Sequence, residues 1–420
     1  MTDVKTQKTA DLLITDAAQV LTCIPAIDDP IGRRDGVNIA ICGEHIAAVG
    51  SPAEVSRQVD VSSAQVIDAA GKIIAPGFVD CHTHVVFGGS RASEYAARMT
   101  LTAAETAKLD IPTGIQATVY MTRSASADEL YRDAADRLMR MFQCGTTTVE
   151  SKSGYGLTLN KEIEQLKVGR RLQESTPLDV VNTFLGAHDF PREIPREQYI
   201  ESLIHEMIPR IGEENLAAFC DVYCDDGYYT IDESRQILEA GLLAGMNPKI
   251  HVDAYADIGG GLMSAEIPVV SADHLNYTPV KTAYAMAQAG VIGVVMPALD
   301  FAVAHPRPFD ARMLMDAGLP LALATDICPG CWTESMQVVM QLACRLYHFS
   351  PEEALLASTY TAARSIGLKD RGTLEAGKLA DIQIWDLPGL DDLIYRIGNN
   401  SVKMVIKRGK IYHIKEDIND

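Results

Sequence analysis

Histidine and aspartate side chains stand at the ends of several apolar stretches of this sequence. His82 and His84 lie two residues apart in VDCHTHVVF, and on a β-strand this spacing points both imidazoles to one face. His251 ends NPKIH, His274 ends PVVSADH and Asp326 ends PLALATD. Nitrogen and oxygen donors of this kind suit a zinc or iron site. The pattern indicates a metal centre, although half-buried histidines with hydrogen-bond partners would also explain a His-x-His pair.

Strand-like runs alternate with amphipathic helical stretches between residues 76 and 370. The runs are GFVDCHTHVVF, GTTTVESKSG, DVVNTFLGAHD, FCDVYC, NPKIHVDAY, PVVSADHL, GVIGVVMPA and PLALATDI. Eight runs separated by helices predict an α/β fold with a (β/α)₈ barrel, whose active site lies at the carboxyl ends of its strands. The candidate metal ligands all fall at such ends, where a barrel would bring them together.

The two ends of the chain have a different pattern. Residues 1–75 and 371–420 contain short β-rich segments, such as VNIAICGEHIAAVG and SVKMVIKRGKIYHI. We expect both ends to combine into one small composite β-sandwich domain, with residues 76–370 forming the barrel domain.

Composition restricts the partners and the compartment. The net charge of −19 argues against nucleic acid and anionic membranes, which need a basic surface. Nine cysteines at irregular spacings are typical of reduced thiols. The start has no basic segment followed by an apolar core, and no apolar run approaches the ~20 residues of a membrane span. We expect a cytoplasmic protein.

Several motifs together resemble the amidohydrolase superfamily and, within it, the imidazolonepropionases. These motifs are PGFVDCHTHVVFGGSR, GTTTVESKSGYGL, FLGAHDFP, KIHVD, SADHL, LALATD and the closing segment GTLEAGKLADIQIWD. The resemblance covers nearly the whole chain. It implies hydrolysis of a cyclic amide C–N bond in a small anionic heterocycle, converting 4-imidazolone-5-propanoate to N-formimidoyl-glutamate. A homodimer is expected from the resemblance alone.

The resemblance also implies roles for matching residues. His82, His84, His251 and Asp326 would hold one divalent ion, zinc or iron. Asp326 would also accept the proton of the attacking water, and His274 would stand beside that water as the second catalytic residue.

Three further residues match substrate positions of this family. Arg91 in FGGSR resembles the clamp for the substrate carboxylate, since a guanidinium pairs with a carboxylate through two hydrogen bonds. Tyr155 in KSGYGL and His188 in GAHD resemble other substrate contacts. Taken alone, these residues could equally be a surface arginine, a packed tyrosine and a core histidine. Lys152, in the same motif as Tyr155, is interpreted as structural.

The chain departs from the family pattern near the expected ring. HVDAYAD places Ala254 where the family has an acidic or amide residue. DICPGC has Cys328 in place of an asparagine and Cys331 in place of a small hydroxyl residue, whereas Gly330 stays. We predict that Cys328, Gly330 and Cys331 line the substrate pocket. Inert packing, a redox pair and a second metal site remain alternatives for the two cysteines.

These departures leave other functions open. A hydantoin or lactam with an acidic side chain is an alternative substrate, because the exchanges remove hydrogen-bonding groups on the ring side. A heterocycle deaminase is disfavoured, since many use a glutamate where this chain has Ala254. A non-enzymatic scaffold is disfavoured because all four metal-ligand positions are kept. The segment LDIPTGIQATVYMTR also departs from the family pattern, and we expect it to form a loop over the pocket.

Overall fold

The protein is described by a computed structural model that covers residues 7–414. Within residues 7–414, the chain divides into two compact units, separated at the boundaries 79/80, 140/141, 147/148 and 334/335. The domain limits expected from the sequence, at 75/76 and 370/371, stay a prediction. Among residues 7–414, no helix has the length and apolar character needed to cross a membrane.

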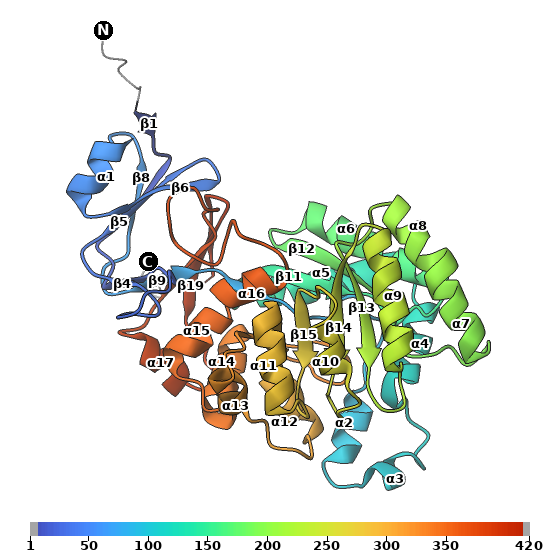
Figure 1. The fold of residues 1–420 in the computed structure, drawn as a ribbon. Helices are drawn as coiled ribbons and strands as arrows, with labels where there is room; N and C mark the ends of the chain where they lie inside the picture. The colour runs from blue at the N-terminus through green and yellow to red at the C-terminus, as the bar shows by residue number, and fades with distance from the viewer. Residues whose placement is uncertain (1–6, 415–420) are drawn as a thin grey trace. The chain divides into compact units, whose positions relative to one another are not determined.

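Eight strands form one sheet in chain order, and neighbours from β11 to β17 run parallel (Figure 1). Backbone hydrogen bonds join the residues that follow the first strand of this sheet to those that follow its last strand. Asp326 N donates to His82 O at 3.1 Å, and His84 N donates to Ile327 O at 3.0 Å. The predicted (β/α)₈ barrel is therefore confirmed. Its strands are β10 (Phe78–Asp80), β11 (Thr146–Lys152), β12 (Asp179–Ala187), β13 (Phe219–Cys224), β14 (Asn247–Val252), β15 (Ser271–His274), β16 (Ile292–Val295) and β17 (Leu321–Leu323).

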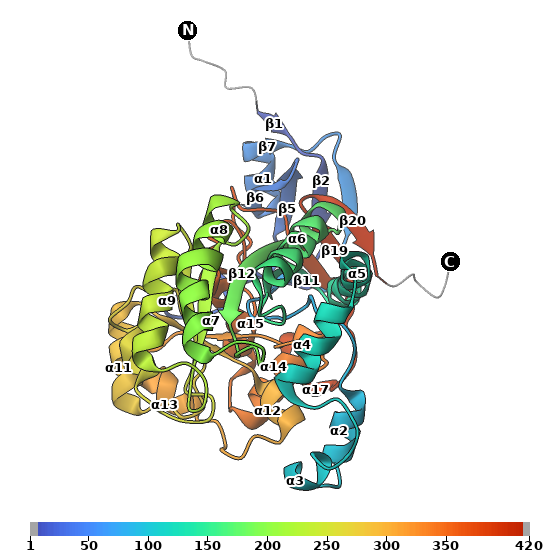
Figure 2. The same cartoon turned by 90° about the vertical axis from the view of Figure 1, so that its right-hand side faces the viewer.

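Helices occupy the connections between the strands, and Figure 2 shows α7, α8 and α9 next to one another on the outside of the barrel. Strands β11 and β13 are buried along their whole length, as expected for a parallel sheet covered on both faces. Helix α9 begins with a capping box between Thr230 and Glu233. The helices here are α2 (Ala92–Arg98), α3 (Ala103–Thr106), α4 (Gly114–Ser124), α5 (Ala127–Gln143), α6 (Leu159–Ser175), α7 (Arg196–Ser202), η1 (Leu203–Met207), α8 (Ile208–Glu213), α9 (Ile231–Leu243), α10 (Gly260–Ser264), α11 (Val280–Ala289), α12 (Pro297–Val303) and α13 (Ala311–Asp316).

The segment expected to form a loop over the pocket is mostly helical. Residues from Gly114 onward form α4, and Gly114 and Ile115 line the pocket described below. The run QATVYMTR contains no proline or glycine, so the helix continues after the Pro-Thr-Gly turn. The expected position at the pocket is confirmed, whereas the expected loop is wrong.

Both chain ends contribute to one β-rich part, as predicted. A six-stranded sheet in the order β20-β19-β18-β9-β3-β4 and a four-stranded sheet in the order β6-β5-β2-β8 supply side chains to a common apolar core. Ile14, Ile41, Ile74, Ile384 and Ile406 belong to this core. The elements are β1 (Lys8–Thr9), β2 (Leu12–Thr15), β3 (Gln19–Leu21), β4 (Arg33–Arg34), β5 (Asn38–Cys42), β6 (His45–Gly50), α1 (Pro52–Gln58), β7 (Val59–Asp60), β8 (Gln65–Asp68), β9 (Ile73–Pro76), α14 (Met336–Leu346), α15 (Pro351–Ala357), α16 (Tyr360–Ser365), β18 (Ile382–Trp385), α17 (Leu390–Tyr395), β19 (Val402–Lys407) and β20 (Lys410–His413).

Candidate active site

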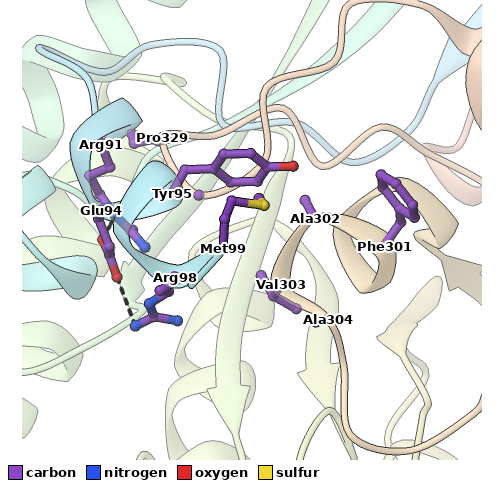
Figure 3. Close-up of a pocket in the computed structure, with 11 residues that line it drawn as sticks. Arg91, Glu94, Tyr95, Arg98, Met99, Phe301, Ala302, Val303, Ala304 and Pro329 are labelled. Carbon is purple, nitrogen blue, oxygen red and sulfur yellow. Dashed lines mark hydrogen bonds and ion pairs between the residues drawn. The ribbon is translucent and has the colours of Figure 1, made fainter. Parts of the chain in front are cut away.

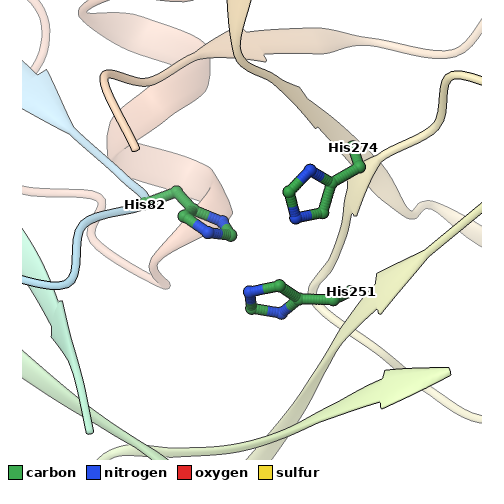
Figure 4. A group of neighbouring side chains, drawn as sticks. All are labelled: His82, His251 and His274. Atoms are coloured by element: carbon green, nitrogen blue, oxygen red, sulfur yellow. The ribbon is translucent and has the colours of Figure 1, made fainter. Parts of the chain in front are cut away.

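The candidate metal ligands come from different strands and meet at one end of the barrel. His82 and His84 follow β10, His251 lies on β14, His274 ends β15, and Asp326 follows β17. The rings of His82 and His251 are 4.6 Å apart between centroids, and those of His251 and His274 are 5.1 Å apart. Figure 4 shows His82, His251 and His274 facing a common space. The structure thus brings together the residues that the sequence placed at strand ends.

Nitrogen and oxygen donors converge closely enough to bind one ion. Donor atoms of His82, His84 and Asp326 lie within 4.8 Å of one another, and so do those of His82, His251 and His274. His188 forms a similar group with His84 and His251, and its ring stacks on His84 at 4.9 Å. We call these residues, His82, His84, His188, His251, His274 and Asp326, the histidine cluster.

Several donor atoms of the cluster are buried and have no hydrogen-bond partner among the described residues. These atoms are His82 Nε2, His84 Nδ1, His251 Nε2 and Asp326 Oδ1. Burial lowers the pKa of His82, His84 and His251 well below the usual histidine value, so their rings are neutral, as metal ligation requires. Burial raises the pKa of the Asp326 carboxyl, and a bound cation would favour its ionised form. The donor set therefore fits a divalent metal ion.

The backbone is strained where two cluster residues leave their strands. His274 has φ 83° and Asp326 has φ 49°, although neither is glycine. Non-glycine residues rarely adopt this left-handed conformation, and it is found most often where a side chain must be aimed at a functional site. Both residues with this conformation offer ligand atoms to the histidine cluster.

Beneath the cluster lies a buried charge network of Glu150, Lys152, Asp221, Lys249 and Asp273, whose side chains are all fully buried. Asp273 Oδ2 lies 2.6 Å from His82 Nδ1, and Asp221 Oδ1 lies 3.1 Å from His251 Nδ1. These contacts leave the Nε2 atoms of both histidines free to face an ion.

Sequence reasoning missed four of these five network residues. Asp221 lies inside FCDVYC and Asp273 inside SADHL, and both runs predict buried strands. A charged residue within such a run was the available signal, because a buried carboxylate requires a partner. Lys152 is named from its motif, but as a structural residue.

A cavity of about 420 Å³ opens above the histidine cluster. Most of the predicted substrate residues line it. These are Arg91, Tyr155, His188, Cys328 and Gly330, and Ala254 lines it as well. Cys331 is buried but is not among the lining residues, and its Sγ contacts Thr325 O at 3.7 Å. The turn between the two cysteines is tight, because Cys328 N donates to Cys331 O at 2.9 Å and Cys331 N donates to Cys328 O at 3.1 Å.

Two arginines, Arg91 and Arg98, line this cavity and share the carboxylate of Glu94. Arg91 Nε donates to Glu94 Oε2 at 2.6 Å, and Arg98 Nη2 lies 2.7 Å from Glu94 Oε1. A second cavity of about 300 Å³ shares Arg91, Arg98 and Gly330 with the first, and Figure 3 shows its lining with the Arg98–Glu94 pair. The Arg91 guanidinium thus has further donors available for an anion.

Comparisons with known proteins agree with this geometry. The amidohydrolase family matches residues 251–412. An imidazolonepropionase of Shouchella clausii is 42% identical over 414 residues, covering 95% of this chain and 92% of that protein. One of Geobacillus thermodenitrificans is 44% identical and covers 87% of each chain.

Solved structures share the fold at lower identity. A triazine hydrolase variant superposes with a TM-score of 0.73 at 17% identity, covering 97% of this chain and 96% of that one. A Xanthomonas campestris adenosine deaminase with bound zinc has a TM-score of 0.70 at 18% identity, covering 99% and 96%. Because curated relatives match at about 40% identity along most of its length, the chain belongs to the imidazolonepropionase family of amidohydrolases.

Proposed function

We propose that the protein hydrolyses a cyclic amide C–N bond in 4-imidazolone-5-propanoate and releases N-formimidoyl-glutamate. The observation that carries this proposal is a histidine and aspartate cluster at the base of a cavity whose side holds Arg91. The 42% identity to an imidazolonepropionase supports it along nearly the whole chain.

In this proposal His82, His84, His251 and Asp326 hold one divalent ion, zinc or iron. When bound, such an ion supplies an activated water at neutral pH by lowering the pKa of that water. The four ligands are those that the family resemblance implies. They are supported by the convergence of His82, His84 and Asp326, by that of His82 with His251, and by the lack of hydrogen-bond partners for His82 Nε2, His251 Nε2 and Asp326 Oδ1 among the described residues.

The chain's own residues then bind the substrate and move the proton. Arg91 pairs with the propionate carboxylate, while Tyr155, His188, Cys328 and Gly330 contact the rest of the molecule. A role of Cys331 at the substrate stays a prediction, and this residue is not among those that line the cavity.

Asp326 and His274 are the proposed catalytic residues. Asp326 has two carboxylate oxygens, so one can face the ion while the other accepts a proton from the attacking water. His274 donates a hydrogen bond to the carbonyl oxygen as charge develops there. The water oxygen bonds to the carbonyl carbon, the ring C–N bond breaks, and the proton passes from Asp326 to the leaving nitrogen.

A modified ring is the second candidate substrate. Ala254 and Cys328 line the cavity, and neither offers a strong hydrogen bond to a ring. A hydantoin or lactam that keeps an acidic side chain would still satisfy Arg91.

A ring-opening assay of purified, metal-analysed protein tests the proposal. The panel is imidazolonepropionate, hydantoin-propionate and carboxylated lactams, with the products identified by mass spectrometry as substrate plus one water. We expect efficient opening of imidazolonepropionate. Turnover of another ring alone would assign the site to that substrate, and ammonia release from an amino-heterocycle would indicate a deaminase instead.

A further inference from the structure

Lys152 places a single ammonium group between two carboxylates that each hold a histidine of the cluster. Its Nζ lies 2.6 Å from Asp221 Oδ2 and 3.3 Å from Asp273 Oδ2. Those carboxylates contact His251 Nδ1 at 3.1 Å and His82 Nδ1 at 2.6 Å. We propose that Lys152 is a positioning residue that fixes both histidines for metal binding through Asp221 and Asp273. The inference rests on the metal site of the proposed function.

The physical reason is the need for a defined ring orientation. A histidine that binds an ion through Nε2 must carry its proton on Nδ1, and a carboxylate at Nδ1 sets both the tautomer and the angle of the ring. Asp221 and Asp273 are fully buried, so two ionised carboxylates this close need a compensating charge. Lys152 supplies that charge at a point shared by both, and thereby couples histidines from two different strands.

A simpler role for Lys152 would be to neutralise Glu150. Lys152 Nζ lies 3.1 Å from Glu150 Oε2, and both residues are on β11. In that case the ammonium would stabilise the fold without affecting the histidines. The two roles predict different Zn²⁺ affinities when Lys152 and Glu150 are both replaced by neutral residues. Neutralisation of Glu150 alone predicts wild-type affinity, whereas the positioning role predicts weaker binding.

Lys249 offers a matched comparison within the same network. Its side chain is also fully buried, and its Nζ lies 2.9 Å from Glu150 Oε1. It donates to Cys81 O at 3.2 Å and lies 3.9 Å from Asp273 Oδ2, beyond hydrogen-bond distance. Replacing Lys249 removes a buried cation but leaves the Lys152 ammonium between the carboxylates of Asp221 and Asp273.

The test uses full-length protein stripped of metal by a chelator. Zn²⁺ affinity is measured by competition with a chromophoric chelator, Co²⁺ loading by its visible spectrum, and thermal unfolding of the metal-free form by circular dichroism. The variants are Lys152→Met, Lys249→Met and the charge-balanced double variant Lys152→Met with Glu150→Gln. The double variant keeps the test decisive if Lys152→Met alone does not fold.

We expect Lys152→Met and the double variant to bind Zn²⁺ about 10–100-fold more weakly, the usual cost of losing an outer partner of a metal ligand. Their Co²⁺ spectra should change, because the ring orientation alters the ligand field. The double variant should regain thermal stability without regaining affinity, and Lys249→Met should lose stability but lose less affinity than Lys152→Met, because its Nζ lies 3.9 Å from Asp273 Oδ2.

Two outcomes would overturn the inference while leaving the proposed function standing. One is wild-type Zn²⁺ affinity in the double variant, and the other is an equal loss of affinity in Lys249→Met. A wild-type protein that binds no divalent ion would overturn both the metal site and this inference. A wild-type protein that binds Zn²⁺ without opening any ring, with the expected losses in the variants, would support the Lys152 role and refute only the proposed reaction.

Discussion

The region beneath the histidine cluster and the wall of the cavity above it are built differently. The buried charge network is fully enclosed, and each of its charges has an opposite charge within 3.3 Å. The cavity wall includes groups in contact with solvent, such as Tyr255 at 50% exposure. The departures from the family pattern that reach the cavity, Ala254 and Cys328, lie in the wall. Removing one charge of the buried network would therefore leave another buried charge uncompensated, whereas exchanging Ala254 or Cys328 in the wall would not.

The largest expected effect comes from removing a ligand of the cluster. His251→Ala should abolish metal binding and reduce ring opening below detection, because His251 Nε2 belongs to the cluster and has no hydrogen-bond partner among the described residues. Metal content by elemental analysis and the initial rate check this expectation. His205→Ala is the matched control, since that side chain is 70% exposed on the outer surface. Retention of both metal and activity by His251→Ala would show that the ion binds elsewhere.

Arg91→Ala tests whether the cavity wall binds the substrate carboxylate, and its effect on kcat/KM should be the next largest. Losing hydrogen bonds to a charged group costs about 1.5–3 kcal/mol, which corresponds to roughly 10–150-fold in kcat/KM. Metal content should stay unchanged, because Arg91 contacts Glu94 rather than the cluster. Arg91→Lys should lose less, since it keeps the charge but not the two-pronged geometry.

The matched control for this prediction is a substrate without the carboxylate. Imidazolone lacking the propionate chain should react at the same rate with wild type and Arg91→Ala. A loss of rate toward both substrates would mean that Arg91 supports the fold of the pocket instead of binding the acid.

The sequence predicted the residues of the histidine cluster far better than the buried charge network that contacts them. Buried parallel strands leave continuous apolar runs, so His82, His251, His274 and Asp326 could be recognised as polar ends of such runs. The pairing of Lys152 with Asp221 could not be recognised, because it joins strands separated by 69 positions and depends on the barrel register. The helical state of residues 114–124 was missed because the turn before it looked like the start of a loop.

Ala254→Glu would restore a carboxylate at a wall position where the family resemblance expects an acidic or amide residue. Ala254 lines the cavity, and its carbonyl oxygen contacts His305 Nε2 at 3.0 Å, a contact that the substitution keeps. If imidazolonepropionate is the substrate, we expect kcat to rise by about tenfold, a modest share of what a positioned proton-transfer group provides. Steady-state kinetics on imidazolonepropionate and hydantoin-propionate measure the change.

Ala256→Glu is the control for added charge in the same loop, because residue 256 is outside the cavity lining. A fall in imidazolonepropionate turnover for Ala254→Glu alone would show that the wall has adapted to a different ring.

The smallest expected effect concerns a carboxyl group beside the wall. Burial raises the pKa of Asp253 to about 7, against hydrogen bonds such as that from Thr278 Oγ1 at 2.7 Å. The unfolded chain loses this proton near pH 4, as aspartate ordinarily does, whereas the folded chain keeps it until about pH 7. Between about pH 4 and pH 7 the folded state therefore binds more protons than the unfolded state. The contribution of Asp253 to the free energy of unfolding of the wild type falls as the pH rises through this range.

Asp253→Asn cannot ionise, so its Tm relative to wild type should rise between about pH 4.5 and pH 7, by roughly 1–3 °C. Differential scanning calorimetry across that range measures the difference, with Asp257→Asn, an exposed residue of the same loop, as the control. A constant Tm difference would mean that Asp253 is ionised in the folded protein. The cavity wall would then hold a buried negative charge close to His251. At this residue, the wall would no longer differ from the buried charge network beneath the histidine cluster.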